Sequence, residues 1–289
     1  MYLLSLSLLA YRSHLSLPKQ AASRAASQTA SQAAVLALAA SLLVGIVSLN
    51  AQTPASAAAK EIHIAAAADL QTVMPPLAQR YEREKGVKLV VSYGSSGTLA
   101  TQILSGEPVD LFLGADYTFP EKIVAANLAD SRDAIPYAKG TLVLWTRKDT
   151  PFNPLHLEAL SDPRVKKIAI ADELRAPYGR AAAAALTRLK IYDQLKPKFV
   201  IGENIAQAGQ FAESGNADLG LISLSMAMSE HFKQLGTYVL VPDVYPEIRQ
   251  CAVVLAKSPR RTETHAFLDW LLTPEIQSEL PKLGLNPVR

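Results

Sequence analysis

Short apolar runs alternate with longer amphipathic stretches along the chain from residue 60 onward. The apolar runs are short and flanked by polar or small residues, which is typical of buried β-strands. They predict strands at 62–67, 88–91, 109–113, 142–145, 167–170, 199–201, 219–222, 238–241 and 252–256.

The stretches between these runs carry apolar residues at helical spacing. Leu77, Ala78 and Tyr81 fit one face of a first helix, and residues 181–189, 205–213 and 263–272 predict others. Strands that alternate with helices of this length predict an α/β fold with a largely parallel sheet. Because such sheets bind ligands beyond the carboxyl ends of their strands, we examine those ends for functional residues.

The first 59 residues have the pattern of a secretory signal. Three basic residues and no acidic residue accompany the apolar run 33–49, and an A-x-A pattern follows at Ala55 and Ala57. Cleavage after this pattern is typical of an exported protein. The alternative is a membrane anchor, since an apolar run of this length is at the short end of a membrane span.

Charge and cysteine content exclude two classes of protein. The chain carries 29 basic and 26 acidic residues, and the segment 1–59 holds three of the bases, so the remainder has no net charge. A neutral protein lacks the basic face that nucleic acid requires. Cys251 is the only cysteine, which excludes a disulfide framework, and its apolar neighbours predict a buried side chain. The histidines have no metal-ligand spacing.

Two glycines bracket two serines where the second predicted strand meets a helix. Ser95 and Ser96 lie between Gly94 and Gly97. The free N–H groups of a helix start, with serine hydroxyls beside them, form a donor-only pocket for an oxyanion. The alternative is an ordinary turn with a helix cap. The segment is one residue too short for the G-x-S-x-G nucleophile elbow.

Asp69 directly follows the first predicted strand, and two interpretations are open. Its carboxylate can cap the next helix by accepting from the N–H of Thr72, or the main chain at this helix start can face an anion. Ser223 follows a later strand and is likewise either a cap or a ligand.

Two further helix starts offer main-chain donors. Pro177 suits the first position of a helix, which leaves the N–H of Tyr178 free. Asn204 is predicted to cap the following helix, where Ile205 can contribute only its N–H.

Several of these stretches together resemble the periplasmic molybdate-binding proteins of bacterial ABC transporters. The resemblance covers the chain from about residue 60 to its end, and it is carried by IHIAAAADLQTVM, YEREKGV, YGSSGTLATQI, GEPVDLFLGAD and FVIGENIAQAGQFAESGNADLGLIS. It implies a class II periplasmic binding protein, in which two α/β lobes enclose the ligand. The expected parts are a signal peptide and leader at 1–59, lobe 1 at 60–140 and 246–289, and lobe 2 at 141–245.

The resemblance also implies a ligand and its binding residues. The oxyanion-binding positions of the family fall on Asp69, Ser96, Tyr178, Ile205 and Ser223. Relatives often have tyrosine where this chain has Ser223. Asp69 is a second departure, because a carboxylate that faces a dianion repels it.

The function implied is capture of molybdate, and of tungstate, in the periplasm by a monomer that delivers the anion to a membrane permease. Neither catalysis, a cofactor nor a bare metal cation is expected. One alternative is another oxyanion such as phosphate or sulfate, since the proton of hydrogen phosphate needs an acceptor such as Asp69. Another is a serine hydrolase that uses Ser95 or Ser96, for which the sequence supplies no evident base.

Overall fold

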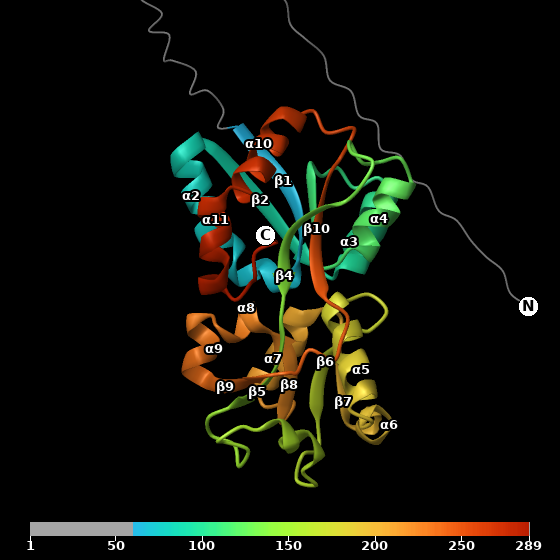
Figure 1. Cartoon of the computed structure of the whole chain (residues 1–289), viewed down its shortest axis with the longest axis vertical. Helices are drawn as coiled ribbons and strands as arrows, with labels where there is room; N and C mark the ends of the chain where they lie inside the picture. The colour runs from blue at the N-terminus through green and yellow to red at the C-terminus, as the bar shows by residue number, and fades with distance from the viewer. Residues whose placement is uncertain (1–59, 289) are drawn as a thin grey trace, which may run out of the picture. The chain divides into compact units, whose positions relative to one another are not determined.

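The computed structural model describes residues 60–288, which form two five-stranded sheets with helices against them (Figure 1). The predicted signal peptide and leader lie outside the described residues. In the described part of the chain no helix is both long and apolar enough to span a membrane.

The first sheet has the strand order β2-β1-β3-β10-β4. It consists of β1 (Lys60–Ala67), β2 (Val87–Gly94), β3 (Leu111–Gly114), β4 (Ile135–Gly140) and β10 (Ile248–Val254). The second sheet has the order β7-β6-β8-β5-β9. It consists of β5 (Leu142–Arg147), β6 (Ile168–Ala171), β7 (Phe199–Gly202), β8 (Leu219–Ser223) and β9 (Gly236–Leu240).

Helices connect most of these strands. The α-helices are α2 (Met74–Lys85), α3 (Ser96–Leu104), α4 (Thr118–Ala125), α5 (Pro177–Arg188), α6 (Tyr192–Leu195), α7 (Ile205–Glu213), α8 (Leu224–Ala227), α9 (Glu230–Leu235), α10 (Arg261–Leu271) and α11 (Pro274–Glu279). Short 3-10 helices are η1 (Ala68–Thr72), η2 (Leu157–Ser161), η3 (Lys196–Lys198) and η4 (Leu280–Leu283).

All nine predicted strands are present. The prediction of a largely parallel arrangement also holds, because four of the five strands in each sheet run in the same direction and one strand is reversed. In the first sheet β1 pairs in parallel with β2 and β3, whereas β10 is antiparallel to both β3 and β4. In the second sheet β6 is parallel to β7 and β8, whereas β5 is antiparallel to β8 and β9. The antiparallel pairs arise where the chain passes from one sheet to the other.

The chain passes between the sheets twice, from β4 into β5 and from β9 into β10 (Figure 1). The first passage lies between Gly140 and Leu142 and the second between Leu240 and Ile248. The predicted lobe boundaries at 140/141 and 245/246 fall in these passages, and the division into lobes at those residues stays a prediction.

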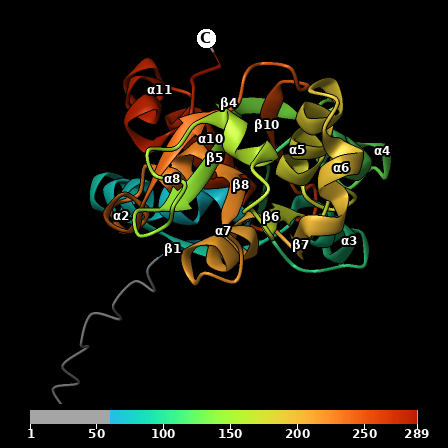
Figure 2. The ribbon, with the colours of Figure 1, turned by 90° about the horizontal axis from the view of Figure 1, so that it is seen from below.

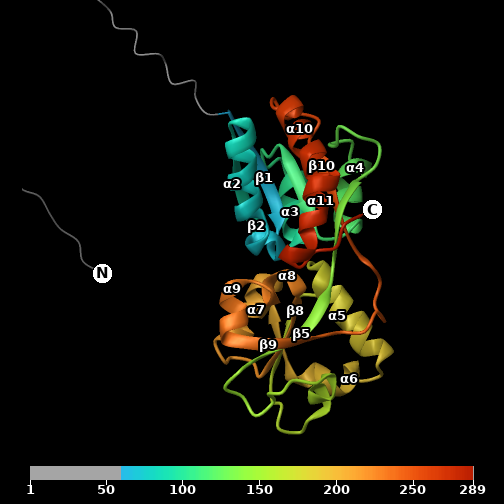
Figure 3. The ribbon, with the colours of Figure 1, turned by 60° about the vertical axis from the view of Figure 1, so that its left-hand side comes forward.

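Alternate residues of β1 face two separate cores. Ile62 and Ile64 pack with Met74 and Leu77 of α2 and with residues of α10 and α11, while Ala65 packs with α3 and α4 on the opposite face. Figures 1 and 3 show these two groups of helices on opposite sides of the first sheet. Cys251 lies in the second of these cores, which confirms its predicted burial.

The second sheet is also covered on both faces, by α7 on one side and α5 on the other (Figure 2). The core of the second sheet also includes three small residues at the carboxyl ends of strands in the first sheet, namely Ala67, Ala68 and Ala115. These alanines follow β1 and β3, so the carboxyl ends of strands in the first sheet lie against the second. That contact is where the predicted site residues should meet.

Candidate functional site

A small cavity lies where the carboxyl ends of strands from both sheets meet. The space inside it is about 10 Å³ for the centre of a water molecule, or about one water. It is lined by Ala67, Ala68, Asp69, Gly94, Ser95, Ser96, Ala115, Ala176, Pro177, Tyr178, Asn204 and Ile205. Four of the five predicted site residues are therefore brought together, and none of the described residues that line the cavity is Lys, Arg or His.

Ser95 and Ser96 have different roles at the start of α3. Ser95 caps the helix, because its Oγ accepts from the N–H of Thr98 at 3.2 Å. The Oγ of Ser96 accepts a hydrogen bond from the main-chain N–H of Ala115, at an N–O distance of 3.0 Å. Within the described residues the O–H of Ser96 has no acceptor, so this hydroxyl remains free to donate into the cavity.

Three helix starts present unpaired N–H groups to the cavity. Pro177 occupies the first turn of α5, as predicted, and Tyr178 follows it. Asn204 caps α7 by accepting from the N–H of Gln207 at 3.0 Å, also as predicted, and Ile205 is the first residue of that helix. The N–H groups of Ser96, Tyr178 and Ile205 have no acceptor among the described residues. Such groups form an anion-binding site.

Asp69 contributes a carboxyl group that is completely buried. Its Oδ2 accepts hydrogen bonds from the hydroxyl of Tyr178 at 3.2 Å and from the side-chain amide of Gln250. Its Oδ1 is buried without a partner among the described residues. The interpretation that Asp69 caps its helix through Thr72 is wrong, because η1 has no side-chain cap and the carboxyl group is directed toward α5 and β10.

Burial raises the pKa of Asp69 from its ordinary 3.8 to about 6, and the hydrogen bonds from Gln250 and Tyr178 offset part of that rise. Burial, together with the nearby charge of Asp69, also raises the pKa of Tyr178 well above its ordinary value. The pKa of buried Tyr137, on β4, is raised for the same two reasons. The site thus contains one group that changes charge near neutral pH.

Ser223 is not among the residues that line the cavity. Its Oγ caps α8 by accepting from the N–H of Met226 at 3.3 Å and lies 3.0 Å from the Oγ of Ser225. Its role as an anion ligand stays a prediction. Ser223 contacts the site indirectly, through Ser225. The Oγ of Ser225 donates to the main-chain oxygen of Asp69 at 2.8 Å.

The sequence analysis missed Gln250 and the hydroxyl of Tyr178. Gln250 is fully buried in β10 and donates to Asp69, which precedes it by 181 residues. A glutamine within the apolar run IRQCAVV was the available signal, because a buried amide needs a polar partner. The partner itself could be identified only once β1 and β10 were placed in the same sheet.

Several contacts join the two sides of the cavity. The N–H of Gly97 donates to the main-chain oxygen of Arg175 at 2.8 Å, and Thr72 Oγ1 donates to the main-chain oxygen of Ser225 at 3.1 Å. A Cβ added to Gly97 would lie 2.9 Å from the Cα of Arg175. The absence of a side chain at Gly97 therefore allows the backbones of the two lobes to meet.

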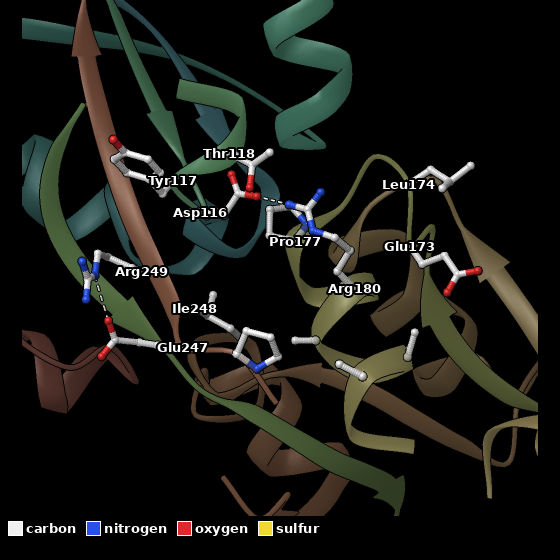
Figure 4. A pocket seen from close by; sticks show the side chains of 14 residues that line it. Asp116, Tyr117, Thr118, Glu173, Leu174, Pro177, Arg180, Glu247, Ile248 and Arg249 are labelled. Carbon is white, nitrogen blue, oxygen red and sulfur yellow. Dashed lines mark hydrogen bonds and ion pairs between the residues drawn. The ribbon is translucent and has the colours of Figure 1, made fainter. Parts of the chain in front are cut away.

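A larger pocket, of about 470 Å³, lies on another side of α5 (Figure 4). Arg180 of α5 points toward Asp116, with which it forms an ion pair, and Arg249 pairs with Glu247 on the opposite wall (Figure 4). Both arginines are already paired with carboxylates here, and none of the predicted site residues lines this pocket. The small cavity is therefore the better candidate for an anion site.

Two linked α/β sheets with a polar cavity between them define a two-lobed binding protein for a small solute. The family model described as bacterial extracellular solute-binding protein matches residues 62–286. The chain therefore belongs to this family of solute-binding proteins.

Two named relatives that are more than 30% identical to this chain are molybdate-binding proteins. The chain is 35% identical to the molybdate-binding protein ModA of Azotobacter vinelandii over 83% of this chain and 95% of that protein. It is 34% identical to ModA of Rhodobacter capsulatus, over 79% and 89% of the two chains. The solved periplasmic molybdate-binding protein of Azotobacter vinelandii superposes with a TM-score of 0.73 at 28% identity, covering 79% of this chain and 100% of that one.

Proposed function

We propose that this chain captures molybdate, and tungstate with it, and delivers the anion to the membrane permease of an ABC transporter. The observation that carries the proposal is the small cavity at the meeting strand ends, where helix starts leave N–H groups unpaired. The similarity to molybdate-binding proteins supports the choice of anion.

The proposed binding uses neutral donors. The N–H groups of Ser96, Tyr178 and Ile205, and the hydroxyl of Ser96, would donate to the oxygens of a tetrahedral dianion. Each N–H lies at the positive end of a helix, which favours negative charge. Hydrogen bonds to a charged acceptor are shorter and about twice as strong as neutral ones, and exclusion of water strengthens them further.

Size would separate molybdate and tungstate from sulfate. The metal–oxygen bonds of the first two anions are longer than the sulfur–oxygen bonds of sulfate. The donors are held by α3, α5 and α7, all of which pack in buried cores, so their positions are fixed. A rigid set of donors spaced for the larger anion would leave sulfate with long, weak hydrogen bonds.

Binding in this proposal involves no covalent chemistry and no cofactor. A hydrolase that uses Ser95 or Ser96 would need a base within hydrogen-bond reach. Ser95 instead caps α3, and Ser96 contacts the main-chain N–H of Ala115. Among residues 60–288 no cluster of side chains is suited to hold a bare metal cation. We also propose that the protein acts as a monomer in the periplasm, which is where the similar solved protein of Azotobacter vinelandii is placed by its name.

A second candidate ligand, hydrogen phosphate, is favoured by one observation. The unpartnered Oδ1 of Asp69 would accept the proton that phosphate keeps near neutral pH. Molybdate has no such proton. Two unit negative charges 4 Å apart repel by about 4 kcal/mol at an effective dielectric constant of about 20, and a dianion would be repelled about twice as strongly. An ionised Asp69 carboxylate thus favours binding of hydrogen phosphate, whereas a neutral Asp69 carboxylic acid favours binding of molybdate.

Calorimetric titration of the purified protein with molybdate, tungstate, sulfate and phosphate in turn tests the proposal. Tight binding of the first two, with no heat from sulfate or phosphate, is the expected result. Binding of phosphate or sulfate alone would refute the assignment of the anion. Failure of a serine-directed covalent probe to label the protein is expected as well, and labelling would support the hydrolase alternative.

A further inference from the structure

The carboxyl group of Asp69 is the one feature of the cavity that conflicts with a dianion. The unpaired polar hydrogens identified at the site belong to donors: the N–H groups of Ser96, Tyr178 and Ile205 and the hydroxyl of Ser96. The two oxygens of Asp69 are also unequal. Oδ2 accepts two hydrogen bonds, whereas Oδ1 is buried and unpartnered.

We propose that Asp69 enters the anion complex as a neutral carboxylic acid with its proton on Oδ1, so that capture of one dianion takes up one proton. This inference rests on the proposed function. The proton comes from the solvent or buffer, and no bond of the anion is formed or broken. The acid O–H then donates to the anion, as a hydroxyl side chain would at the same position.

The described residues around Asp69 favour protonation of its carboxyl group, because they include no cation that could pair with its charge. The titratable groups that face it are the hydroxyls of Tyr178 on α5 and Tyr137 on β4, both neutral at physiological pH. Gln250 on β10 and Ser225 on α8 contact it and carry no charge. Within the described residues no cation contacts its carboxyl group. Among the described groups that contact Asp69, none can therefore neutralise its charge when a dianion enters, whereas a proton can.

Placement of the proton follows from the hydrogen bonds. Oδ2 is already an acceptor for Tyr178 and Gln250, so a proton there would have to displace a donor. Oδ1 has no donor to displace. The burial that raises the pKa of Asp69 to about 6 keeps the energetic cost of protonation small near neutral pH. The free protein is nonetheless mostly ionised at about pH 7.5, so binding there requires uptake.

Calorimetry in two buffers measures the uptake directly. Molybdate is titrated at about pH 7.5 in a buffer of low and a buffer of high ionisation enthalpy, and the difference in heat gives the protons exchanged. The wild-type protein should take up about one proton, and its affinity should fall about tenfold for each pH unit above about 6. Asp69→Asn and Asp69→Ser should bind with no proton uptake and with an affinity that does not change with pH.

A matched control is Asp110→Asn. Asp110 is a second buried carboxyl group of the first sheet's side, but it contacts Ser258 and Arg260 and does not line the cavity. This variant should still take up about one proton per molybdate. Tyr178→Phe gives a further readout, because losing a donor to Oδ2 disfavours the ionised form. The pH at which the affinity begins to fall should then move upward.

The outcomes separate this inference from the function on which it rests. Molybdate binding by the wild-type protein with no proton uptake, or with uptake that persists in Asp69→Asn, would overturn the role of Asp69 alone. No molybdate binding at any pH would overturn the proposed function and this inference with it. The wild-type proton count decides the question even if a variant fails to fold.

Discussion

Replacement of Asp69 by asparagine should stabilise the anion-free protein at neutral pH. The substitution keeps the shape of the side chain and leaves one oxygen to accept from Tyr178 and Gln250. It removes a charge that is completely buried. An ionised carboxylate in that position loses its hydration without gaining a cation, which destabilises the folded state.

The magnitude follows from the pKa of Asp69. Folding raises that pKa from 3.8 to about 6, and each pKa unit corresponds to about 1.4 kcal/mol, so the ionised form costs about 3 kcal/mol. The folded protein holds its proton more tightly than the unfolded chain does. Stability from this group is therefore fully present below about pH 4, is lost as the pH rises to about 6, and is constant above that.

Urea denaturation of both proteins without anion, at several pH values, is the assay. The variant should be more stable by up to about 3 kcal/mol at about pH 7.5, and the difference should vanish near pH 4. Asp110→Asn serves as the control and should destabilise the protein, because it removes the charge of a buried carboxyl group that pairs with the partly exposed Arg260. A difference that does not change with pH, or a variant less stable at neutral pH, would refute the reasoning.

Three further substitutions test the site. Ser96→Ala removes a donor and leaves a buried N–H unpaired, so molybdate affinity measured by calorimetry should fall about 10- to 100-fold, and an unchanged affinity would exclude Ser96 from the site. Ser223→Ala removes the cap of α8; it should cost about 1 kcal/mol in urea denaturation and change affinity less than about threefold, whereas a large loss of affinity would show that Ser223 binds the anion. Gly97→Ala places a Cβ 2.9 Å from the backbone of Arg175, which should hold the lobes apart. If the closed form falls to about a tenth of the population, the affinity for molybdate falls about tenfold. X-ray scattering in the presence of molybdate should then give a larger radius of gyration for the variant than for the wild-type protein, and equal radii would contradict this steric effect.

The local pattern of apolar and polar residues was sufficient to predict most strands, because short apolar runs between helices are usually buried as strands of a sheet. It missed β4, where Pro136 interrupts the run and only part of the strand is buried. It also did not indicate that β5 and β10 run antiparallel to their neighbours. Their antiparallel pairing depends on the chain passing from one sheet to the other, which is a property of the whole topology and leaves no local signal.

The part of the candidate site that could be predicted consists of residues at helix starts that follow the carboxyl ends of strands. Ser96, Tyr178 and Ile205 each follow a strand and open a helix, so sequence position alone indicated free N–H groups. The contacts of Asp69 could not be predicted in this way. Its partner Gln250 is on a strand that returns from the other sheet, and the choice between capping and facing the cavity depends on that long-range contact.

Crystallographic anomalous scattering from bound tungstate would show whether the small cavity is the anion site, since it locates the anion without assuming its ligands. We expect a tungsten peak in this cavity, with anion oxygens about 2.7 to 2.9 Å from Ser96 Oγ and from the main-chain nitrogens of Tyr178 and Ile205. A tungsten site elsewhere, for example beside Arg180 in the larger pocket, would contradict this expectation.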